Sequence, residues 1–175
     1  MDVAVKEATI DRFLYEYPQA AGARREHSAL HGCEEIRWAE FPGCPARIPV
    51  LLHGLLDQAA AAEAQRVLAN SMFDIAEMNP AMPELLPFLL RLAGDPALPE
   101  RSGLLDHLIM AADYSEPVDP THEAMALWFG VDSEHPERER CRAVFTRYAS
   151  VVEMLPDSLI APDGRAKLRR AAGLL

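Results

Sequence analysis

Four side chains of the kind that bind zinc lie near the N-terminus. They supply two imidazole and two thiol donors between residues 27 and 44: His27, His31, Cys33 and Cys44. Zinc sites in proteins hold such donors as close pairs on tight turns. The paired CxxC of a zinc knuckle does not occur, a glycine follows His31, and Cys44 stands in a Gly-Cys-Pro turn. Zinc is therefore the less favoured interpretation, and thiols without a metal are the favoured one.

Other reactive side chains form no recognisable catalytic pattern. A nucleophilic cysteine needs an adjacent base, whereas Cys141 falls on the apolar face of a predicted helix, where packing is the commoner role. The acidic stretch from Asp113 to Glu123 lacks the spacing of a calcium-binding loop. The motifs GxxxxGK, GxGxxG and GxSxG do not occur either. We therefore expect a protein that is not an enzyme and has no cofactor or metal.

Composition and periodicity predict one all-α domain over residues 1–175. The chain is 50% hydrophobic and 25% charged, a balance typical of globular proteins. Apolar residues recur at intervals of three and four, which predicts helices throughout. The first residues do not resemble a secretory signal, the longest apolar stretch is too short to span a membrane, and the three cysteines are few and odd in number. We expect a cytoplasmic protein without a membrane segment.

Two stretches of the sequence repeat with a spacing of 38 residues. Each carries a proline, two leucines and an aspartate at the same intervals: Pro49, Leu51, Leu52 and Asp57, then Pro87, Leu89, Leu90 and Asp95. Proline is favoured at a helix start, the leucines form one buried stripe, and aspartate is common in turns. Each copy therefore predicts a pair of helices joined by a tight turn, at about 48–78 and 83–113. The two pairs must stack to bury their apolar stripes.

The repeated segments resemble HEAT-like repeats, which build α-solenoids. The resemblance is carried by IPVLLHGLLD, ELLPFLLRLAGDP and GLLDHLIMAA. These segments are similar to small bacterial HEAT-like proteins, some of which are immunity proteins encoded beside polymorphic toxins. The resemblance implies a short right-handed α–α superhelix with helical caps over 1–45 and 119–175. It also implies an ion pair between Asp95 and Arg101 in the second copy, whereas Glu63 replaces that arginine in the first.

The predicted caps consist of further helices. An N-terminal helix places apolar residues on one face, namely Ile10, Phe13, Leu14 and Tyr17. The C-terminal cap is predicted to contain a short helix at 122–129, a longer helix from Pro136 to 155, and a basic last turn or short helix at 165–170.

The second helix of each pair carries a polar stripe that is a candidate binding surface. In solenoids the inner helices of successive pairs line a concave surface that binds partners. The stripe consists of charged, polar and apolar residues with helical spacing: Glu63, Arg66, Asn70, Asp74, Glu77, Asp106, Met110, Asp113 and Tyr114. A solvated face without a partner is the alternative, because every surface helix has a polar side.

The charge of the chain is −10 and is unevenly distributed. Residues 1–136 hold 9 Lys and Arg against 22 Asp and Glu, a balance of −13, whereas residues 137–175 hold 8 against 5, a balance of +3. The negative part repels nucleic acids and attracts basic proteins. We therefore expect a basic protein partner and no nucleic acid, with solubility as the alternative explanation for the acidic charge.

These features together favour a non-enzymatic protein-binding module, an immunity-type inhibitor of a basic toxin or another basic protein. Exposed apolar anchors such as Met110, Tyr114 or Trp128 are expected to supply affinity, while acidic faces speed the encounter. A scaffold or adaptor in a multi-protein complex is the alternative. An enzyme on a HEAT-like scaffold, like the HEAT-like DNA glycosylases, is less favoured because it needs a positive groove. The sequence leaves the oligomeric state open.

Overall fold

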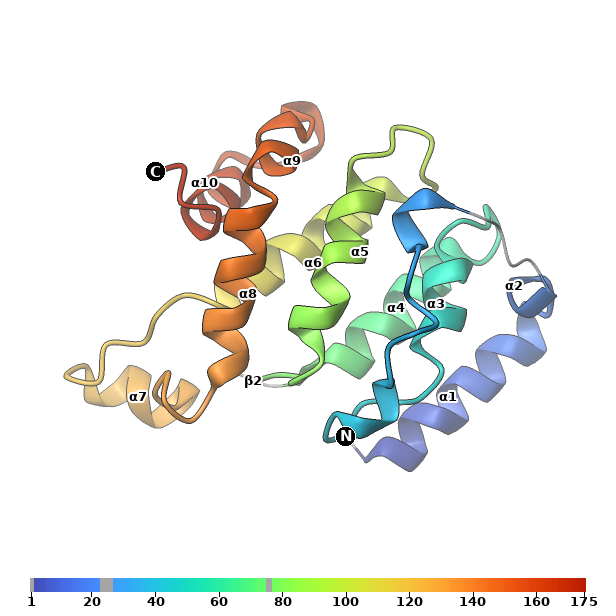
Figure 1. Cartoon of the computed structure of the whole chain (residues 1–175), viewed down its shortest axis with the longest axis horizontal. Coiled ribbons are helices and arrows are strands. Elements are labelled where there is room, and N and C mark those ends of the chain that lie inside the picture. The colour runs from blue at the N-terminus through green and yellow to red at the C-terminus, as the bar shows by residue number, and fades with distance from the viewer. Residues whose placement is uncertain (1, 23–26, 75–76) are drawn as a thin grey trace.

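The computed structural model describes residues 2–22, 27–74 and 77–175 (Figure 1). Helix accounts for 63% and strand for 2% of the chain, which confirms the predicted all-α fold. Within the described residues, no helix is both long and apolar enough to cross a membrane. The α-helices are α1 Val3–Glu16, α2 Gln19–Gly22, α3 Ile48–Gly54, α4 Ala61–Met72, α5 Met82–Ala93, α6 Arg101–Tyr114, α7 Glu123–Phe129, α8 Pro136–Arg147, α9 Ala149–Met154 and α10 Pro162–Ala171. The shorter elements are the 3-10 turns η1 Ser28–Leu30, η2 Trp38–Glu40 and η3 Asp157–Leu159, and the strands β1 Phe73–Asp74 and β2 Glu77–Met78.

Successive helix pairs form two layers. Helix α3 packs on α4, α5 on α6, and α8 on α10. Within the second layer α4 contacts α6, α6 contacts α10, and α1 lies against α4 (Figure 1). The first predicted helix pair, at 48–78, contains α3 and α4. The second, at 83–113, contains almost all of α5 and α6. Helix α7 lies outside both layers and projects beside α8.

An apolar core runs between the layers and extends to α1. Ile10 and Phe13, predicted on one face of the N-terminal helix, are 0% and 1% exposed. Gly54 lets α1, α3 and α4 approach closely, because a Cβ atom there would lie 2.8 Å from Phe13 Cζ and 3.0 Å from Ala64 Cβ. The close packing of these three helices therefore requires a residue without a side chain at position 54.

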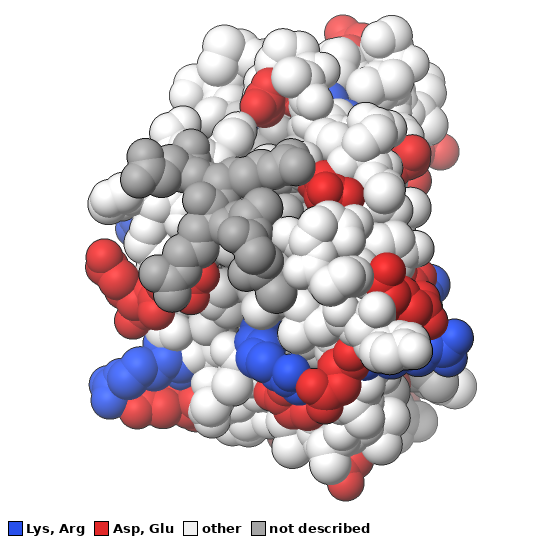
Figure 2. Space-filling model, turned by 90° about the vertical axis from the view of Figure 1, so that its right-hand side faces the viewer, with Lys and Arg blue, Asp and Glu red and all other residues white. Residues whose placement is uncertain are grey.

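Ion pairs also join α1 to α3. Arg47, which precedes α3, places Nε 2.9 Å from Glu7 Oε2 and Nη1 2.6 Å from Asp11 Oδ1. On α1 itself, Arg12 Nε lies 2.9 Å from Glu16 Oε1. Figure 2 shows the face of the molecule at the α1 end. Basic and acidic side chains lie next to one another on the lower half of this face. This end therefore has a mixed surface charge.

Pro87 does not open a helix, although the 38-residue repeat predicts that it does. Helix α5 begins at Met82, and Pro83 takes the position in its first turn where a missing N–H is not needed. Pro87 lies inside the helix, at a cost of roughly 3 kcal/mol. Burial of each leucine in α5 contributes about 1.5–3 kcal/mol, so the four flanking leucines outweigh that cost. They are 0–1% exposed: Leu85, Leu86, Leu89 and Leu90.

Helix α4 ends at Met72 rather than near residue 78, which corrects a second prediction. Phe73 adopts an extended conformation, and the backbone N–H of Asn79 donates to the carbonyl of Met72 at 2.7 Å. That carbonyl would otherwise accept from the next turn of the helix. Asp74 and Glu77 consequently face each other in a two-residue antiparallel ladder. The apolar spacing of this stretch also predicts Ile75 on the inner face of the helix, but Ile75 lies outside the described residues.

The predicted helix from 136 to 155 is divided in two. Helix α8 ends at Arg147, and α9 follows after a change of backbone direction at Tyr148. The break allows Val152 to become fully buried where α9 meets α5 and α10. Arg165 of α10 donates to the carbonyls of Val152, Glu153 and Leu155 and so satisfies the end of α9. The basic C-terminal segment is thus a complete helix packed on the stack.

Replacing Gly54 by alanine is expected to lower the free energy of unfolding by about 1–3 kcal/mol, because the added methyl group overlaps Phe13 and Ala64. The usual effect of this change in a helix is a stabilisation of about 1 kcal/mol. Asn70→Ala on the exposed side of α4 is the control and should change stability by no more than about 0.5 kcal/mol. Urea unfolding followed by circular dichroism measures both variants. A Gly54→Ala protein as stable as the wild type would contradict this packing.

Candidate functional site

The predicted stripe lies on the exposed side of α4 and α6, but some of its charges are already paired. Glu63 Oε1 lies 2.5 Å from Arg66 Nη2, and the hydrogen bond from this arginine lowers the pKa of Glu63. Asp113 Oδ1 lies 2.7 Å from Lys167 Nζ of α10. The remaining members on these two helices are exposed: Asn70, Asp106 and Met110. The stripe therefore offers a partner fewer unpaired charges than its sequence indicates.

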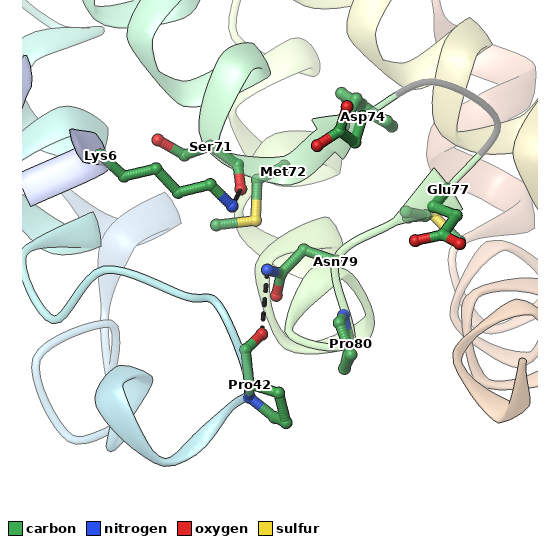
Figure 3. A pocket seen from close by; sticks show the side chains of 10 residues that line it. Lys6, Pro42, Ser71, Met72, Asp74, Glu77, Asn79 and Pro80 are labelled. Atoms are coloured by element: carbon green, nitrogen blue, oxygen red, sulfur yellow. Dashed lines mark hydrogen bonds between the residues drawn. The ribbon is translucent and has the colours of Figure 1, made fainter. Parts of the chain in front are cut away.

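Asp74 and Glu77 lie beside a cavity of about 180 Å³ at the end of α4 (Figure 3). The basic group in this cavity is Lys6, whose Nζ donates to the carbonyls of Gly43 and Ser71 at 2.8 Å each. Burial lowers the pKa of this ammonium group. Because both bonds go to the backbone, Lys6 ties α1 to the end of α4.

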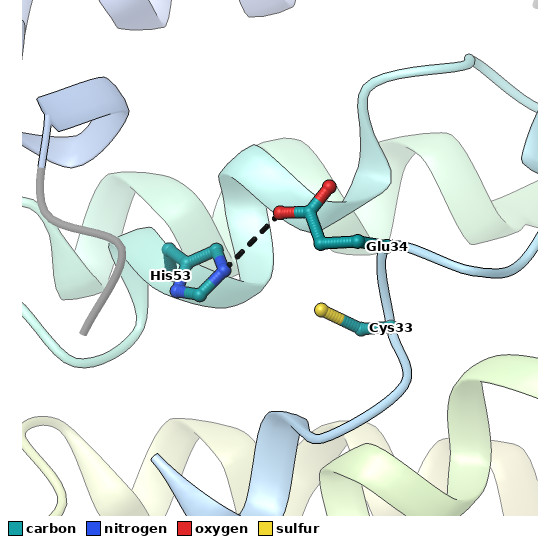
Figure 4. A group of neighbouring side chains, drawn as sticks. All are labelled: Cys33, Glu34 and His53. Carbon is teal, nitrogen blue, oxygen red and sulfur yellow. Dashed lines mark ion pairs between the residues drawn. The ribbon is translucent and has the colours of Figure 1, made fainter. Parts of the chain in front are cut away.

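The four candidate zinc donors, for which a metal is the less favoured interpretation, are dispersed. His27 Nε2 lies 3.1 Å from Asp95 Oδ2, the thiol of Cys44 donates to the following carbonyl at 3.6 Å, and His31 is exposed. Their interpretation as one four-donor site is wrong. Cys33 instead lies beside Glu34 and His53, neither of which belongs to the candidate set (Figure 4).

Tyr114 is not the exposed anchor that the sequence predicts. Its ring stacks on Phe73 with the ring centroids 5.7 Å apart, and its hydroxyl donates to the carbonyl of Asp74 at 3.4 Å. Tyr114 thus holds the β1–β2 hairpin against α6. The other two predicted anchors, Met110 and Trp128, are 37% and 70% exposed.

Met110 and Asp113 border a hollow of about 460 Å³ between the end of α6 and α7. Apolar side chains from the connecting loop and from α7 form much of its lining, including Val118, Met125 and Phe129. Polar side chains, including Asp113, Glu116 and Arg138, complete the lining, and a hollow of this size can receive a large side chain of a partner.

Helix α7 is the most exposed apolar element among the described residues. None of its seven residues is buried, and Met125, Leu127 and Trp128 are 44%, 85% and 70% exposed. Contiguous apolar patches on a protein surface mark interaction sites. Sequence reasoning selected Trp128 but missed Met125 and Leu127. The available signal was the run AMALWF, which gives this helix no polar side to turn toward water.

The backbone at the end of α7 is held by an arginine of α8. Arg138 is only 3% exposed, and its guanidinium donates to the carbonyls of Phe129 and Gly130. A buried guanidinium must be satisfied by several acceptors, and these carbonyls supply two. The contact therefore fixes the point where the chain leaves α7.

Asp132 links the start and the end of the α7 segment to α8. Its Oδ1 accepts from the backbone N–H of Val118 at 3.3 Å, and its Oδ2 accepts from Arg142 Nη2 at 2.9 Å. Arg142 Nη1 also donates to the carbonyl of Ser115 at 2.5 Å. Burial opposes the charge of Asp132, but these hydrogen bonds outweigh it, and its pKa is lowered. We call Asp132, Arg138 and Arg142 the arginine clamp.

The sequence around α7 is acidic. Residues 102–137 contain no Lys or Arg but eight Asp and Glu: Asp106, Asp113, Glu116, Asp119, Glu123, Asp132, Glu134 and Glu137. Basic residues of α8 and α10 pair with some of these acids, as Arg170 does with Glu116 at 2.5 Å. Asp119, Glu123 and Glu134 remain exposed beside the apolar side chains of α7. Among Lys, Arg, Asp and Glu, the segment 102–137 therefore contributes only acidic side chains, and the basic residues beside it come from α8 and α10.

Comparison with known proteins gives no match. No protein-family model, curated protein or solved structure matches the chain. The HEAT-like resemblance therefore stays a prediction, and one of its implications is wrong. Asp95 pairs with His27, while Arg101 Nε donates to the carbonyl of Ala93 at 2.7 Å. The two side chains do not form the ion pair implied by the resemblance.

Replacing Asp132 by asparagine is expected to loosen α7 without unfolding the stack. A neutral amide accepts weaker hydrogen bonds from Val118 and Arg142, so the protection factors of backbone amides 118–131 should fall about 10- to 100-fold, or roughly 1.4–2.8 kcal/mol. Hydrogen–deuterium exchange read by mass spectrometry measures this change, with α5 and α6 as internal references.

Acid should loosen the same segment in the wild type. A carboxyl group whose folded pKa is lowered stabilises the folded state above its ordinary pKa of about 4, and this contribution is lost as pH falls through the lowered value. The Asp132→Asn variant should show no such decline. Glu123→Gln, exposed on α7 and outside the clamp, is the matched control and should behave as the wild type. Equal protection of wild type and Asp132→Asn at neutral pH would refute the role of the clamp.

Proposed function

We propose that the chain is a non-enzymatic protein-binding module that captures a basic protein on α7 and the neighbouring Met110. The observation that carries this proposal is the exposure of Leu127 and Trp128 on a helix with no buried residue. Tryptophan is enriched among the residues that dominate binding energy. A tryptophan on a positioned helix also loses less conformational freedom on binding than one on a free segment. The arginine clamp supplies that positioning.

Surface charge supports a basic partner. The α7 segment exposes the acids Asp119, Glu123 and Glu134 together with the apolar side chains of α7. A partner with lysines and arginines around an apolar patch is attracted over a distance and oriented before contact. The exposed acids then set the rate and orientation of binding, while the apolar side chains supply most of the affinity. Of the predicted stripe, Met110, Asp113 and Tyr114 of α6 line the hollow beside α7.

An immunity-type inhibitor of a basic toxin domain is the specific role that we propose. The stacked pairs α3–α4, α5–α6 and α8–α10 support a short right-handed superhelix of the HEAT-like kind. An inhibitor requires a preorganised surface rather than reactive groups, since affinity depends on how little the surface must reorder on binding. A helix held by a clamp on a packed stack meets that requirement.

A scaffold or adaptor is the second candidate, because the C-terminal part has the opposite charge. Residues 138–175 hold 8 Lys and Arg against 4 Asp and Glu. Many of these basic groups already pair with acids or carbonyls. Arg147 at the end of α8, however, is exposed and can contact an acidic protein while a basic one binds at α7. The two roles differ in the activity of the bound partner, which an inhibitor abolishes and an adaptor leaves intact.

Replacing Trp128 by alanine is expected to weaken binding of a basic protein encoded next to this chain about 30-fold or more, since loss of a central aromatic anchor costs roughly 2 kcal/mol or more. Isothermal titration calorimetry with the full chain measures the dissociation constant. Tyr15→Ala is the matched control, because Tyr15 is an aromatic residue 88% exposed on α1 at the other end of the molecule. Its loss should leave the affinity unchanged.

Equal affinities of the two variants would contradict the proposal, as would a preference for an acidic partner. A wild-type dimer that Trp128→Ala dissociates, detected by light scattering, would show instead that a second copy covers α7. Co-expression distinguishes the two roles, because an inhibitor should protect cells that express the neighbouring toxin and the Trp128→Ala variant should protect them less.

A further inference from the structure

Three side chains of metal-binding type meet where the loop between η1 and η2 contacts α3 (Figure 4). We call this loop, residues 31–37, the N-terminal loop. The thiol of Cys33, a carboxylate oxygen of Glu34 and an imidazole nitrogen of His53 all lie within 4.8 Å of one another. Glu34 Oε1 and His53 Nε2 are 3.4 Å apart. Ligands at 2.0–2.3 Å from a tetrahedral zinc ion are separated by about 3.3–3.7 Å. The carboxylate and the imidazole therefore already have the spacing of two zinc ligands.

The surrounding structure fixes two of these donors and leaves the third adjustable. Cys33 is 1% exposed, and its carbonyl accepts a hydrogen bond from Trp38 Nε1 at 2.9 Å. His53 lies in the last turn of α3, and its side chain is 12% exposed. The side chain of Glu34 is 56% exposed, so its carboxylate can move toward the thiol without disturbing the core.

We propose that Cys33, Glu34 and His53 form a zinc site with water in the fourth position. Zinc accepts thiolate, imidazole and carboxylate ligands together, whereas magnesium and calcium prefer oxygen ligands alone. On binding, the thiol proton leaves to solvent and the sulfur forms a bond to zinc. The metal links residues 33 and 34 to α3 and fastens the loop that also contacts α5 through η1.

Zinc titration of the full chain, after removal of bound metal with a chelator, tests the site. Competition with a chromogenic zinc indicator should show one bound equivalent of zinc per chain. Cys33→Ser and His53→Gln should each weaken binding at least tenfold, because each removes one of the proposed zinc ligands. Cys141→Ser, which alters another fully buried thiol, is the matched control and should bind as the wild type.

Cobalt(II) distinguishes loss of a ligand from loss of the fold. The wild type should show thiolate-to-cobalt charge-transfer absorption, and Cys141→Ser should retain it. Glu34→Gln alters an exposed side chain, so circular dichroism should be unchanged while the cobalt spectrum shifts and zinc binds more weakly. Absence of an equivalent of bound zinc in the wild type would overturn the proposal, as would wild-type cobalt spectra and zinc affinity in Glu34→Gln.

Discussion

Helix α7 cannot hold its position by burial, and this constraint governs the candidate functional surface. The other helices longer than one turn are fixed by apolar side chains in the core, whereas α7 has no buried residue. Its place is set by polar contacts at its flanks, from Arg138 to Phe129 and Gly130 and from Asp132 to Val118 and Arg142. Charge-assisted hydrogen bonds are the stronger kind of polar contact in proteins. They let Trp128 remain exposed and still be positioned.

The stack of helix pairs provides the base for these contacts. Helix α8 carries both clamp arginines and packs on α5, α6 and α10. Its inner residues Cys141 and Phe145 are fully buried, so the guanidinium groups start from a fixed backbone. The other end of the segment begins at α6, whose last turn is joined to α10 by Asp113 and Lys167. Helix α7 has no buried residue, and its position is thus determined by α6 and α8, which are themselves packed in the core. The zinc site would act comparably on the N-terminal loop, by fastening it to α3.

The all-α fold and the buried helix faces could be predicted from sequence because both depend on local periodicity. Phe13 is buried as its spacing predicts. The ends of helices could not be predicted in this way, because they depend on hydrogen-bond partners outside the local pattern. At the end of α4, for example, the N–H of Asn79 donates to the carbonyl of Met72. The candidate site was predicted only in part. The residue types of Met110 and Trp128 indicate anchors, but the clamp joins loop backbone to distant side chains, for which a sequence carries no periodic signal.

Site-specific photo-crosslinking in cells tests most directly whether α7 is the element that meets a partner. A photoreactive amino acid replaces Leu127 in one version of the full chain and Tyr15 in another; both side chains are at least 85% exposed. If α7 is the docking element, position 127 crosslinks to a basic protein that position 15 does not capture. The same products at both positions, or an acidic protein at position 127, would contradict the assignment.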